Sequence, residues 1–123
     1  MHRFLTALVF SLFLAGTAGA AEHNDRHMLT VITDDGTQTQ AMALILTRQW
    51  VKDGGSAQIL LCDAAGGMAL SDSDVGDESV QPPGVSPRQM LAGLIEAGVR
   101  VDVCAIYLPT GGMDRSDLRE GIG

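Results

Sequence analysis

The sequence contains few aromatic residues, and they are unevenly placed. Phe, Trp and Tyr make up 4% of the 123 residues, and all three Phe lie within residues 1–20. Beyond residue 20 the only aromatic side chains are those of Trp50 and Tyr107. Aromatic rings usually contribute much of a small protein's buried area. A core built beyond residue 20 must therefore consist mainly of Leu, Ile, Val, Met and Ala.

Positive charge is also scarce. The chain has 8 Lys and Arg against 15 Asp and Glu, which gives a formal net charge of −7. An acidic surface repels phosphate backbones, and no cluster of Lys and Arg stands out in the sequence. We therefore predict that nucleic acids are not partners of this protein.

The longest apolar run lies near the N-terminus, where its flanks identify it as a secretory signal peptide. Arg3 precedes the uncharged run Phe4–Leu14, and residues 18–20 (Ala-Gly-Ala) form a small-residue cleavage site. Eleven residues are too few to span a bilayer, which needs about 20. We predict a signal peptide over residues 1–20, a periplasmic or secreted location, and no stable membrane span after cleavage. Removing 20 of the 123 residues leaves 103, enough for one domain, with a net charge of −8.

Strand and helix patterns alternate along the rest of the chain. The predicted order is a linker over 21–27, a strand over 28–33, a helix over 39–52, a strand over 57–62, a long loop over 64–85, a helix from residue 86 to 97, a strand over 99–107 and a short helix from residue 114 or 116 to 120. Such alternation favours a mainly parallel sheet with helices on both faces. The sequence therefore predicts an α/β domain of the three-layer αβα type over residues 28–123.

The start of the second helix carries a clear local signal. Ser86 is a good helix cap, Pro87 suits the first helical position, and Gln89 completes a capping box. We therefore expect a helix that begins immediately after Ser86.

Polar residues and both cysteines follow the predicted strands. The set comprises Asp34 after the first strand, Cys62 and Asp63 after the second, and Cys104, Tyr107, Gly111 and Gly112 in or after the third. In an open parallel sheet, ligands bind beyond the carboxyl ends of the strands. We therefore expect these residues to contribute to one site at that edge.

Three interpretations of the cysteines are open at this point. An even number of cysteines in an exported protein makes a Cys62–Cys104 disulfide the first hypothesis. Such a bond needs Cα atoms within about 7 Å, which adjacent strands allow and an intervening strand does not. Alternatively, each cysteine is a small buried core residue. Near helix N-termini, a cysteine can instead be a reactive thiolate.

Signatures of cofactor binding are absent from the sequence. There is no G-x-G-x-x-G, G-x-x-x-x-G-K-[ST], G-x-S-x-G or H-E-x-x-H motif. The acidic stretch 72–78 lacks the ligand order of a calcium-binding EF-hand loop. A C-x-x-C redox motif is also missing, which makes a dithiol redox couple the weakest interpretation of the cysteines. We therefore predict no cofactor and no metal.

The overall pattern resembles the DsrE-like (DsrE/DsrF) family of sulfur-relay proteins. The similar segments are 29–33 with the helix around 41–44, 54–66, 91–99 and, most tellingly, 99–108 around Cys104. The resemblance implies a flavodoxin- or Rossmann-like αβα fold and a homo-oligomer. The family usually continues with a further helix and strand, so we expect the last βα piece to be absent here, with truncation at the C-terminus and an open sheet edge.

The resemblance also implies a function. In active members, a cysteine in the place of Cys104 carries sulfur as a persulfide and passes it to a partner protein's thiol. Cys104 is thus the predicted catalytic residue of a sulfur carrier or sulfurtransferase, and Cys62 is a weaker accessory candidate. The predicted pocket residues are Asp34, Asp63, Tyr107, Gly111 and Gly112. The alternative is a non-catalytic periplasmic binding or assembly module of the same fold, in which the cysteines are structural.

Overall fold

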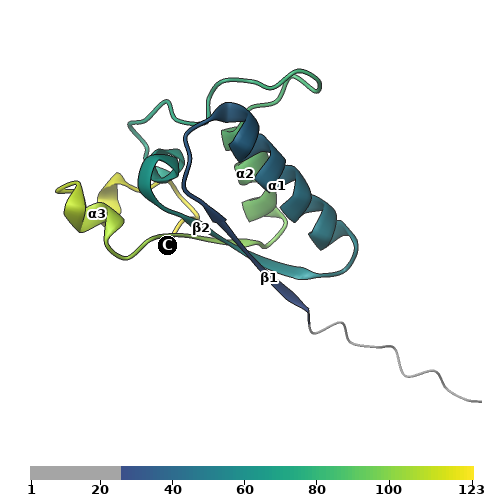
Figure 1. Ribbon diagram of the computed structural model, residues 1–123. Helices are drawn as coiled ribbons and strands as arrows, with labels where there is room; N and C mark the ends of the chain where they lie inside the picture. The colour runs from purple at the N-terminus through teal and green to yellow at the C-terminus, as the bar shows by residue number, and fades with distance from the viewer. Residues whose placement is uncertain (1–25) are drawn as a thin grey trace, which may run out of the picture.

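The computed structural model describes residues 26–123. The predicted signal peptide and most of the predicted linker lie outside the described residues. The elements, in chain order, are β1 (His27–Ile32), α1 (Thr37–Lys52), β2 (Ser56–Leu61), the 3-10 helix η1 (Asp63–Ala69), α2 (Pro87–Glu96), β3 (Arg100–Val103), α3 (Tyr107–Thr110) and the 3-10 turn η2 (Arg115–Asp117) (Figure 1). Because β1 begins at His27, the predicted linker overlaps the first strand by one residue.

The three strands form one parallel sheet in the order β1-β2-β3. In the register, Ile32 pairs with Leu61, and Leu61 pairs with Val103. Each crossover between neighbouring strands contains a helix, α1 in the first and α2 in the second. The predicted α/β class with a parallel sheet is therefore confirmed.

The core lies between the sheet and the two long helices. It is built from aliphatic residues and Met, including Ile32, Leu44, Ile59, Leu61, Met68, Leu91, Leu94 and Val101. On β1, Thr30 points toward α1, where its hydroxyl lies 2.7 Å from that of Thr47. Trp50 and Tyr107 are both only half-buried. The core therefore has the aliphatic composition that the shortage of aromatics predicts.

Both long helices lie on the same side of the sheet and contact each other (Figure 1). Alternate residues of β1 face away from them. Leu29 and Val31, which face away from the helices, are 54% and 50% exposed. Apolar side chains consequently remain accessible on β1 within the described part of the chain.

The second long helix begins as predicted. The Ser86 hydroxyl accepts a hydrogen bond from the backbone N–H of Gln89, and the Gln89 side chain accepts one from the backbone N–H of Ser86. Pro87 occupies the first helical position, where no intrahelical donor is needed. The capping-box prediction is confirmed.

The third strand is shorter than the predicted 99–107, because its partner ends. The last ladder bond runs from the backbone N–H of Cys104 to the carbonyl of Leu61, 2.9 Å away. Beyond Leu61, the chain of β2 turns into η1 and offers no further partner. The N–H of Tyr107 then donates to the carbonyl of Cys104 at 2.8 Å. Tyr107 therefore starts the short helix α3 and does not lie on β3.

The predicted final helix over residues 114–120 is wrong. Asp114 caps only the 3-10 turn η2, through a 2.7 Å hydrogen bond from the backbone N–H of Ser116. The chain then returns to the sheet, where the N–H of Gly123 donates to the carbonyl of Val101 at 3.0 Å. The C-terminal residues thus pair with the outer edge of β3.

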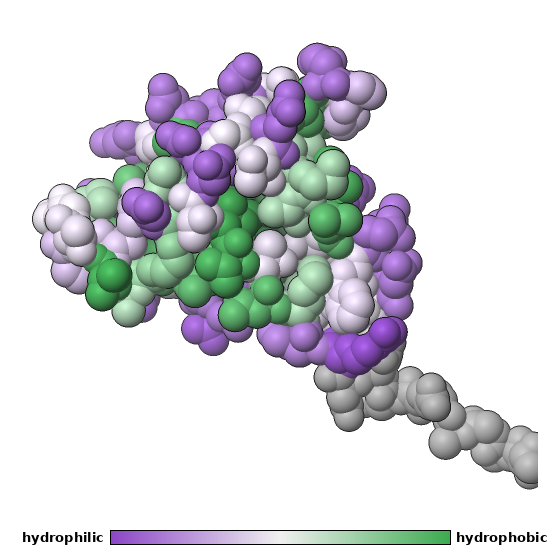
Figure 2. Space-filling model, in the orientation of Figure 1, coloured by the Kyte–Doolittle hydropathy of each residue, from purple (hydrophilic) through white to green (hydrophobic). Residues whose placement is uncertain are grey.

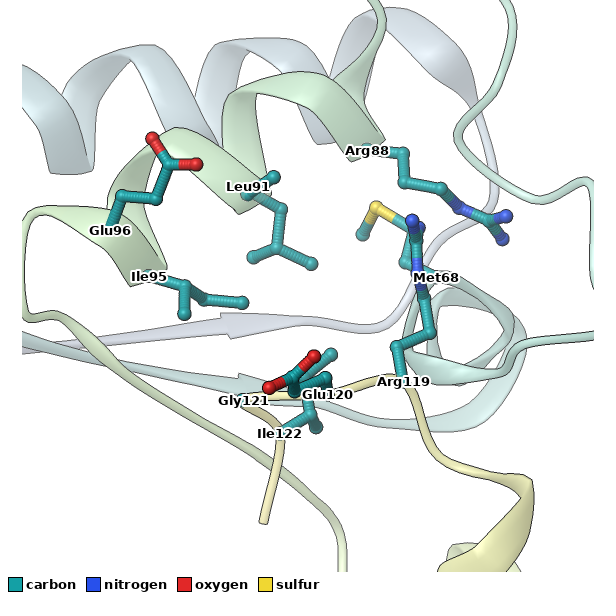
Figure 3. A pocket seen from close by; sticks show the side chains of 10 residues that line it. Met68, Arg88, Leu91, Ile95, Glu96, Arg119, Glu120, Gly121 and Ile122 are labelled. Carbon is teal, nitrogen blue, oxygen red and sulfur yellow. The ribbon is translucent and has the colours of Figure 1, made fainter.

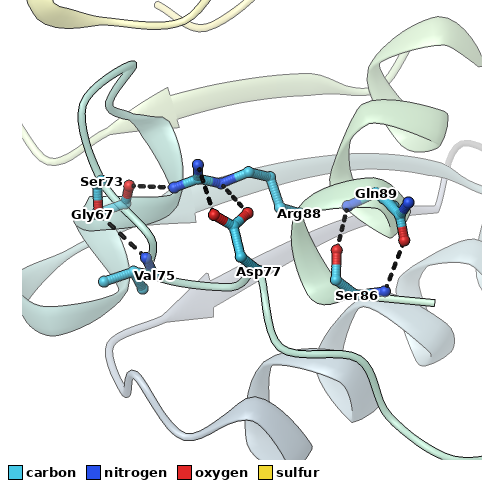
Figure 4. Close-up of polar contacts among 7 residues, drawn as sticks. All are labelled: Gly67, Ser73, Val75, Asp77, Ser86, Arg88 and Gln89. Atoms are coloured by element: carbon cyan, nitrogen blue, oxygen red, sulfur yellow. Dashed lines mark hydrogen bonds and ion pairs between the residues drawn. The ribbon is translucent and has the colours of Figure 1, made fainter. Parts of the chain in front are cut away.

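The predicted long loop over residues 64–85 is partly ordered by contacts with α2 (Figure 4). Its first part forms η1, in which Ala65 and Met68 are completely buried. The guanidinium of Arg88 donates to the carbonyl of Gly67 at 3.1 Å and lies 3.3 Å from the carboxylate of Asp77. Arg88 therefore holds two distant parts of the segment against the start of α2.

Among residues 26–123, no helix combines the length and the apolar character that crossing a bilayer requires.

Candidate functional site

The structure brings Cys62 and Cys104 together at the carboxyl edge of the sheet. Each cysteine directly follows a strand, and main-chain hydrogen bonds of 2.9 Å hold both of them in the ladder, from Cys62 to Ile32 and from Cys104 to Leu61. Their Cα atoms are 5.2 Å apart, and their sulfur atoms form a disulfide. Both residues are half-buried, so neither is a fully buried core cysteine. Of the three interpretations, the described structure contains the disulfide.

A cavity of about 450 Å³ opens beside one of the two cysteines. Its lining is mostly apolar and comprises Val103, Cys104, Ala105, Leu108, Pro109, Met113, Asp114, Arg115, Leu118 and Gly123. Cys104 lines this cavity and Cys62 does not. The two halves of the disulfide therefore differ in their surroundings, because Cys104 alone belongs to the lining of this cavity.

Tyr107 positions the helix that forms one wall of this cavity. Its ring packs against Gly66 in η1, so closely that a Cβ atom on Gly66 would overlap the ring. Burial of the phenol raises the pKa of Tyr107 above its ordinary value of 10.0. Tyr107 therefore remains a neutral, mainly structural side chain near neutral pH.

Two of the residues that line the cavity, Asp114 and Arg115, are charged, and Asp102 of β3 precedes Cys104. Hydrogen bonds from Ser116 lower the pKa of Asp114 below its ordinary value. Asp102, two residues before Cys104, accepts hydrogen bonds of 2.7 Å from both Arg100 and Gln58. The Arg100 hydrogen bond is the largest cause of a lowered pKa for Asp102, and Arg115 adds to this effect through its charge. The groups around Cys104 thus include acidic side chains that stay ionised at neutral pH.

Asp34 and Asp63, two of the predicted pocket residues, are absent from the lining of the cavity at Cys104. The carboxylate of Asp34 accepts a 2.7 Å hydrogen bond from the N–H of Gly36 and shapes the turn into α1. Asp63 follows Cys62 directly and is exposed, with a backbone φ of 48°. This left-handed conformation, which Asp tolerates better than most residues, allows the chain to turn from β2 into η1.

Gly111 and Gly112 lie at the exposed end of α3 and also do not line the cavity. The apolar part of the lining instead includes Leu108, Met113 and Leu118. These three residues are not among those predicted from the sequence. Their signal was the presence of apolar side chains inside a segment rich in glycine, proline and charge.

A second cavity, of about 470 Å³, lies between α2, η1 and the C-terminal segment (Figure 3). Met68, Leu91 and Ile95 contribute apolar side chains to it. Its charged lining residues are Arg88, Arg119, Glu96 and Glu120, two of each sign. It shares no lining residue with the cavity at Cys104. The predicted site residues are absent from its lining.

Within residues 26–123, no three side chains of His, Cys, Asp or Glu converge in a way that could hold a metal ion.

The comparisons with known proteins bear on the fold. No family model and no curated protein matches the chain significantly. A solved structure of a protein of unknown function from Methanobacterium thermoautotrophicum superposes with a TM-score of 0.58 and 20% sequence identity, over 80% of this chain and 79% of that one. The similarity supports the α/β architecture of this chain.

Proposed function

We propose that the protein is an exported, DsrE-like carrier of sulfane sulfur, in which Cys104 holds the sulfur as a persulfide and Cys62 resolves it. The position of Cys104 carries the proposal. This residue lines a cavity of about 450 Å³, and its sulfur is bonded to that of Cys62, which follows the neighbouring strand. A carrier thiol must be reached in turn by a donor and by an acceptor, and the cavity provides such access.

Loading starts from the reduced pair. A dithiol reductant of the compartment opens the disulfide, and the Cys104 thiolate then attacks the outer sulfur of a donor persulfide. The S–S bond of the donor breaks, and the donor leaves as a thiolate. Cys104 retains the transferred sulfur as a persulfide, without net oxidation or reduction in the transfer step.

Delivery repeats this exchange with a partner protein's thiolate as the attacking group and the Cys104 thiolate as the leaving group. Without an acceptor, the Cys62 thiolate attacks the Sγ atom of Cys104, hydrosulfide leaves, and the disulfide forms again. Main-chain hydrogen bonds hold both cysteines at the ends of adjacent strands, with Cα atoms 5.2 Å apart. This separation lies within the range of protein disulfides, so closure needs no backbone movement.

The test uses the reduced protein and a small-molecule persulfide donor, followed by intact mass and peptide mapping. Wild type is expected to gain one sulfur atom on Cys104 transiently and to end as the disulfide. The variant Cys62→Ser should retain the added sulfur longer, because it cannot resolve. The variant Cys104→Ser should gain none. Equal gain in Cys104→Ser, or no gain in Cys62→Ser, would overturn the proposal.

A binding or assembly module with a structural disulfide is the second candidate. It is favoured by the sequence separation of 42 residues between the cysteines, because a disulfide that closes such a loop stabilises the folded state by about 4 kcal/mol in the chain-entropy model. A structural pair should resist alkylation after reduction of the folded protein. Rapid labelling of Cys104, with Cys62 labelled slowly, would favour the carrier.

A further inference from the structure

The two edges of the sheet differ in how they are covered. At β3, the C-terminal residues pair with the outer edge, through hydrogen bonds of 3.0 Å from Gly123 to Val101 and from Val103 to Gly123. At β1, no other segment of residues 26–123 pairs with the outer edge. Unpaired N–H and C=O groups along a strand edge are a template for a further strand. The edge of β1 is therefore a candidate interaction surface.

Successive residues of β1 point their N–H and C=O groups to opposite sides of the strand. This alternation determines which residues could bond to a further strand. The carbonyl oxygens of Arg26 and Ile32 accept hydrogen bonds from the β2 side, at 3.4 and 2.9 Å. Main-chain groups alternate in direction along a strand, so the even-numbered residues face β2. The main-chain groups of the odd-numbered residues, Leu29 and Val31 among them, consequently point outward.

Apolar side chains accompany this free edge. Leu29 and Val31 are about half-exposed on β1, on the face of the sheet that the long helices leave open. In Figure 1, β1 and α1 both lie in front, with α2 behind α1. Figure 2 shows apolar surface across the middle of the same view, between hydrophilic upper and lower margins. An incoming strand would thus meet both free main-chain groups and apolar side chains.

We propose that β1 pairs, in antiparallel orientation, with β1 of a second copy of this chain about a twofold axis at Thr30. In this register, Leu29 lies opposite Val31 of the second copy, and the reverse holds by symmetry. Because both residues point their main-chain groups outward, each such pair exchanges two hydrogen bonds. The two side chains also lie on the same face of the extended sheet, where they bury each other.

The charges at the two ends of β1 favour a second copy in this orientation. Arg26 and His27 stand at the start of the strand, and Asp34 and Asp35 follow its end. Antiparallel pairing about Thr30 brings the basic start of β1 toward the acidic residues that follow the end of β1 in the second copy, whereas parallel pairing would align like charges. Arg26 can keep its contact with the ring of Trp50, 5.1 Å from the centroid.

Other registers satisfy fewer of these conditions. A register shifted by one residue would set residues with outward main-chain groups opposite residues whose main-chain groups face β2. The hydrogen bonds between the two copies would then be lost. A shift of two residues would set Arg26 opposite Ile32, or else set Leu29 opposite Thr33. The register about Thr30 alone combines the hydrogen-bonding phase, the apolar pair and the opposite charges.

The first test is sedimentation velocity of the exported protein over a wide concentration range. Wild type is expected to dimerise, and Val31→Lys should raise the dimer dissociation constant at least about tenfold, because a charge at a strand edge disfavours pairing. The matched control is Ile106→Lys, at an apolar residue that is 75% exposed near α3. A wild type that is monomeric throughout, or an assembly unaffected by Val31→Lys, would overturn the proposal.

The second test uses amide hydrogen exchange to identify which amides of β1 become hydrogen-bonded when the dimer forms. The amide of Thr30, which faces β2, should be protected at every concentration. The amides of Leu29 and Val31 should become protected only as the dimer forms. Protection of these two amides that does not depend on concentration would mean that another segment of the same chain covers the edge, and would overturn the proposal.

Discussion

The ring of Tyr107 lies directly against Gly66, and this contact joins the two segments that follow the cysteines. Gly66 is buried in η1, which begins one residue after Cys62, and Tyr107 starts α3, three residues after Cys104. The absence of a side chain at Gly66 lets α3 approach η1 closely. The shape of the cavity beside Cys104 therefore depends on a glycine outside its lining.

A methyl group at Gly66 should test this dependence. We expect Gly66→Ala to lower the free energy of unfolding by about 1–3 kcal/mol, because the added Cβ overlaps the Tyr107 ring and overpacking carries a cost of this size. Urea denaturation measures the change. In a Tyr107→Ala background the cost of Gly66→Ala should fall by at least half, and an undiminished cost would contradict the assigned contact.

The matched control is Gly93→Ala in α2. A Cβ at Gly93 meets no atom within 4 Å, and the residue is exposed inside a helix. Alanine has the higher helix propensity, so this variant should be more stable than wild type by about 0.5–1 kcal/mol. The two Gly→Ala changes are therefore expected to have opposite signs.

Local signals in the sequence predicted much of the fold. The Ser86 capping box, the β-branched strands and the glycine-rich helix ends all depend on neighbouring residues, and the order of elements follows from them. The residue at which β3 ends could not be predicted from such local signals. Val101, Val103, Ala105 and Tyr107 continue an alternating pattern, but the strand stops because β2 turns away after Leu61.

The candidate site was predicted less completely than the fold. Cys62 and Cys104 could be placed at the same edge because both follow predicted parallel strands. The cavity wall could not be predicted, because Leu108 and Met113 reach Cys104 only through the turn that replaces the end of the predicted strand. The anchoring of the long segment by Arg88 is likewise a tertiary contact, between residues far apart in the sequence.

Reduction of the Cys62–Cys104 disulfide should lower the stability of the domain without unfolding it. The sequence separation of 42 residues corresponds to a loss of about 4 kcal/mol in the chain-entropy model. Urea denaturation with and without a reductant measures the difference. The double variant Cys62→Ala/Cys104→Ala should be insensitive to the reductant. A loss below about 1 kcal/mol in wild type would indicate that the pair constrains the unfolded chain far less than this model predicts.

Loss of the cap should destabilise α2. The Ser86 side chain is buried and accepts a 3.2 Å hydrogen bond from the N–H of Gln89. We expect Ser86→Ala to lower the free energy of unfolding by about 1 kcal/mol, the usual effect of removing an N-cap. Ser79→Ala, at an exposed position in the preceding segment, serves as the control and should stay within about 0.5 kcal/mol of wild type. Equal effects of the two variants would rule out a specific contribution of the cap.

Asp102 should make stability depend on acidity at low pH. Its pKa in the folded protein is lowered from the ordinary value of 3.8, first by the Arg100 hydrogen bond and further by that of Gln58. A lowered folded pKa means that the unfolded chain takes up the proton first as the pH falls. The stabilisation is therefore complete well above pH 3.8 and is lost as the pH falls through the lower, folded pKa. Asp102→Asn should cost about 1 kcal/mol at pH 7, the scale of a hydrogen bond with one charged partner near the surface.

The measurement for Asp102 is urea denaturation of wild type and Asp102→Asn at several pH values between 7 and the acid transition. The difference between the two proteins should be constant near neutrality and should shrink below about pH 3.8, where the unfolded wild-type chain takes up a proton at Asp102 that the folded protein binds only at lower pH. Arg100→Gln removes the largest cause of the lowered pKa of Asp102. The stability difference between wild type and Arg100→Gln should therefore show most of the same pH dependence. A difference that stays constant down to the acid transition would mean that the carboxylate contributes through shape and packing and not through its charge.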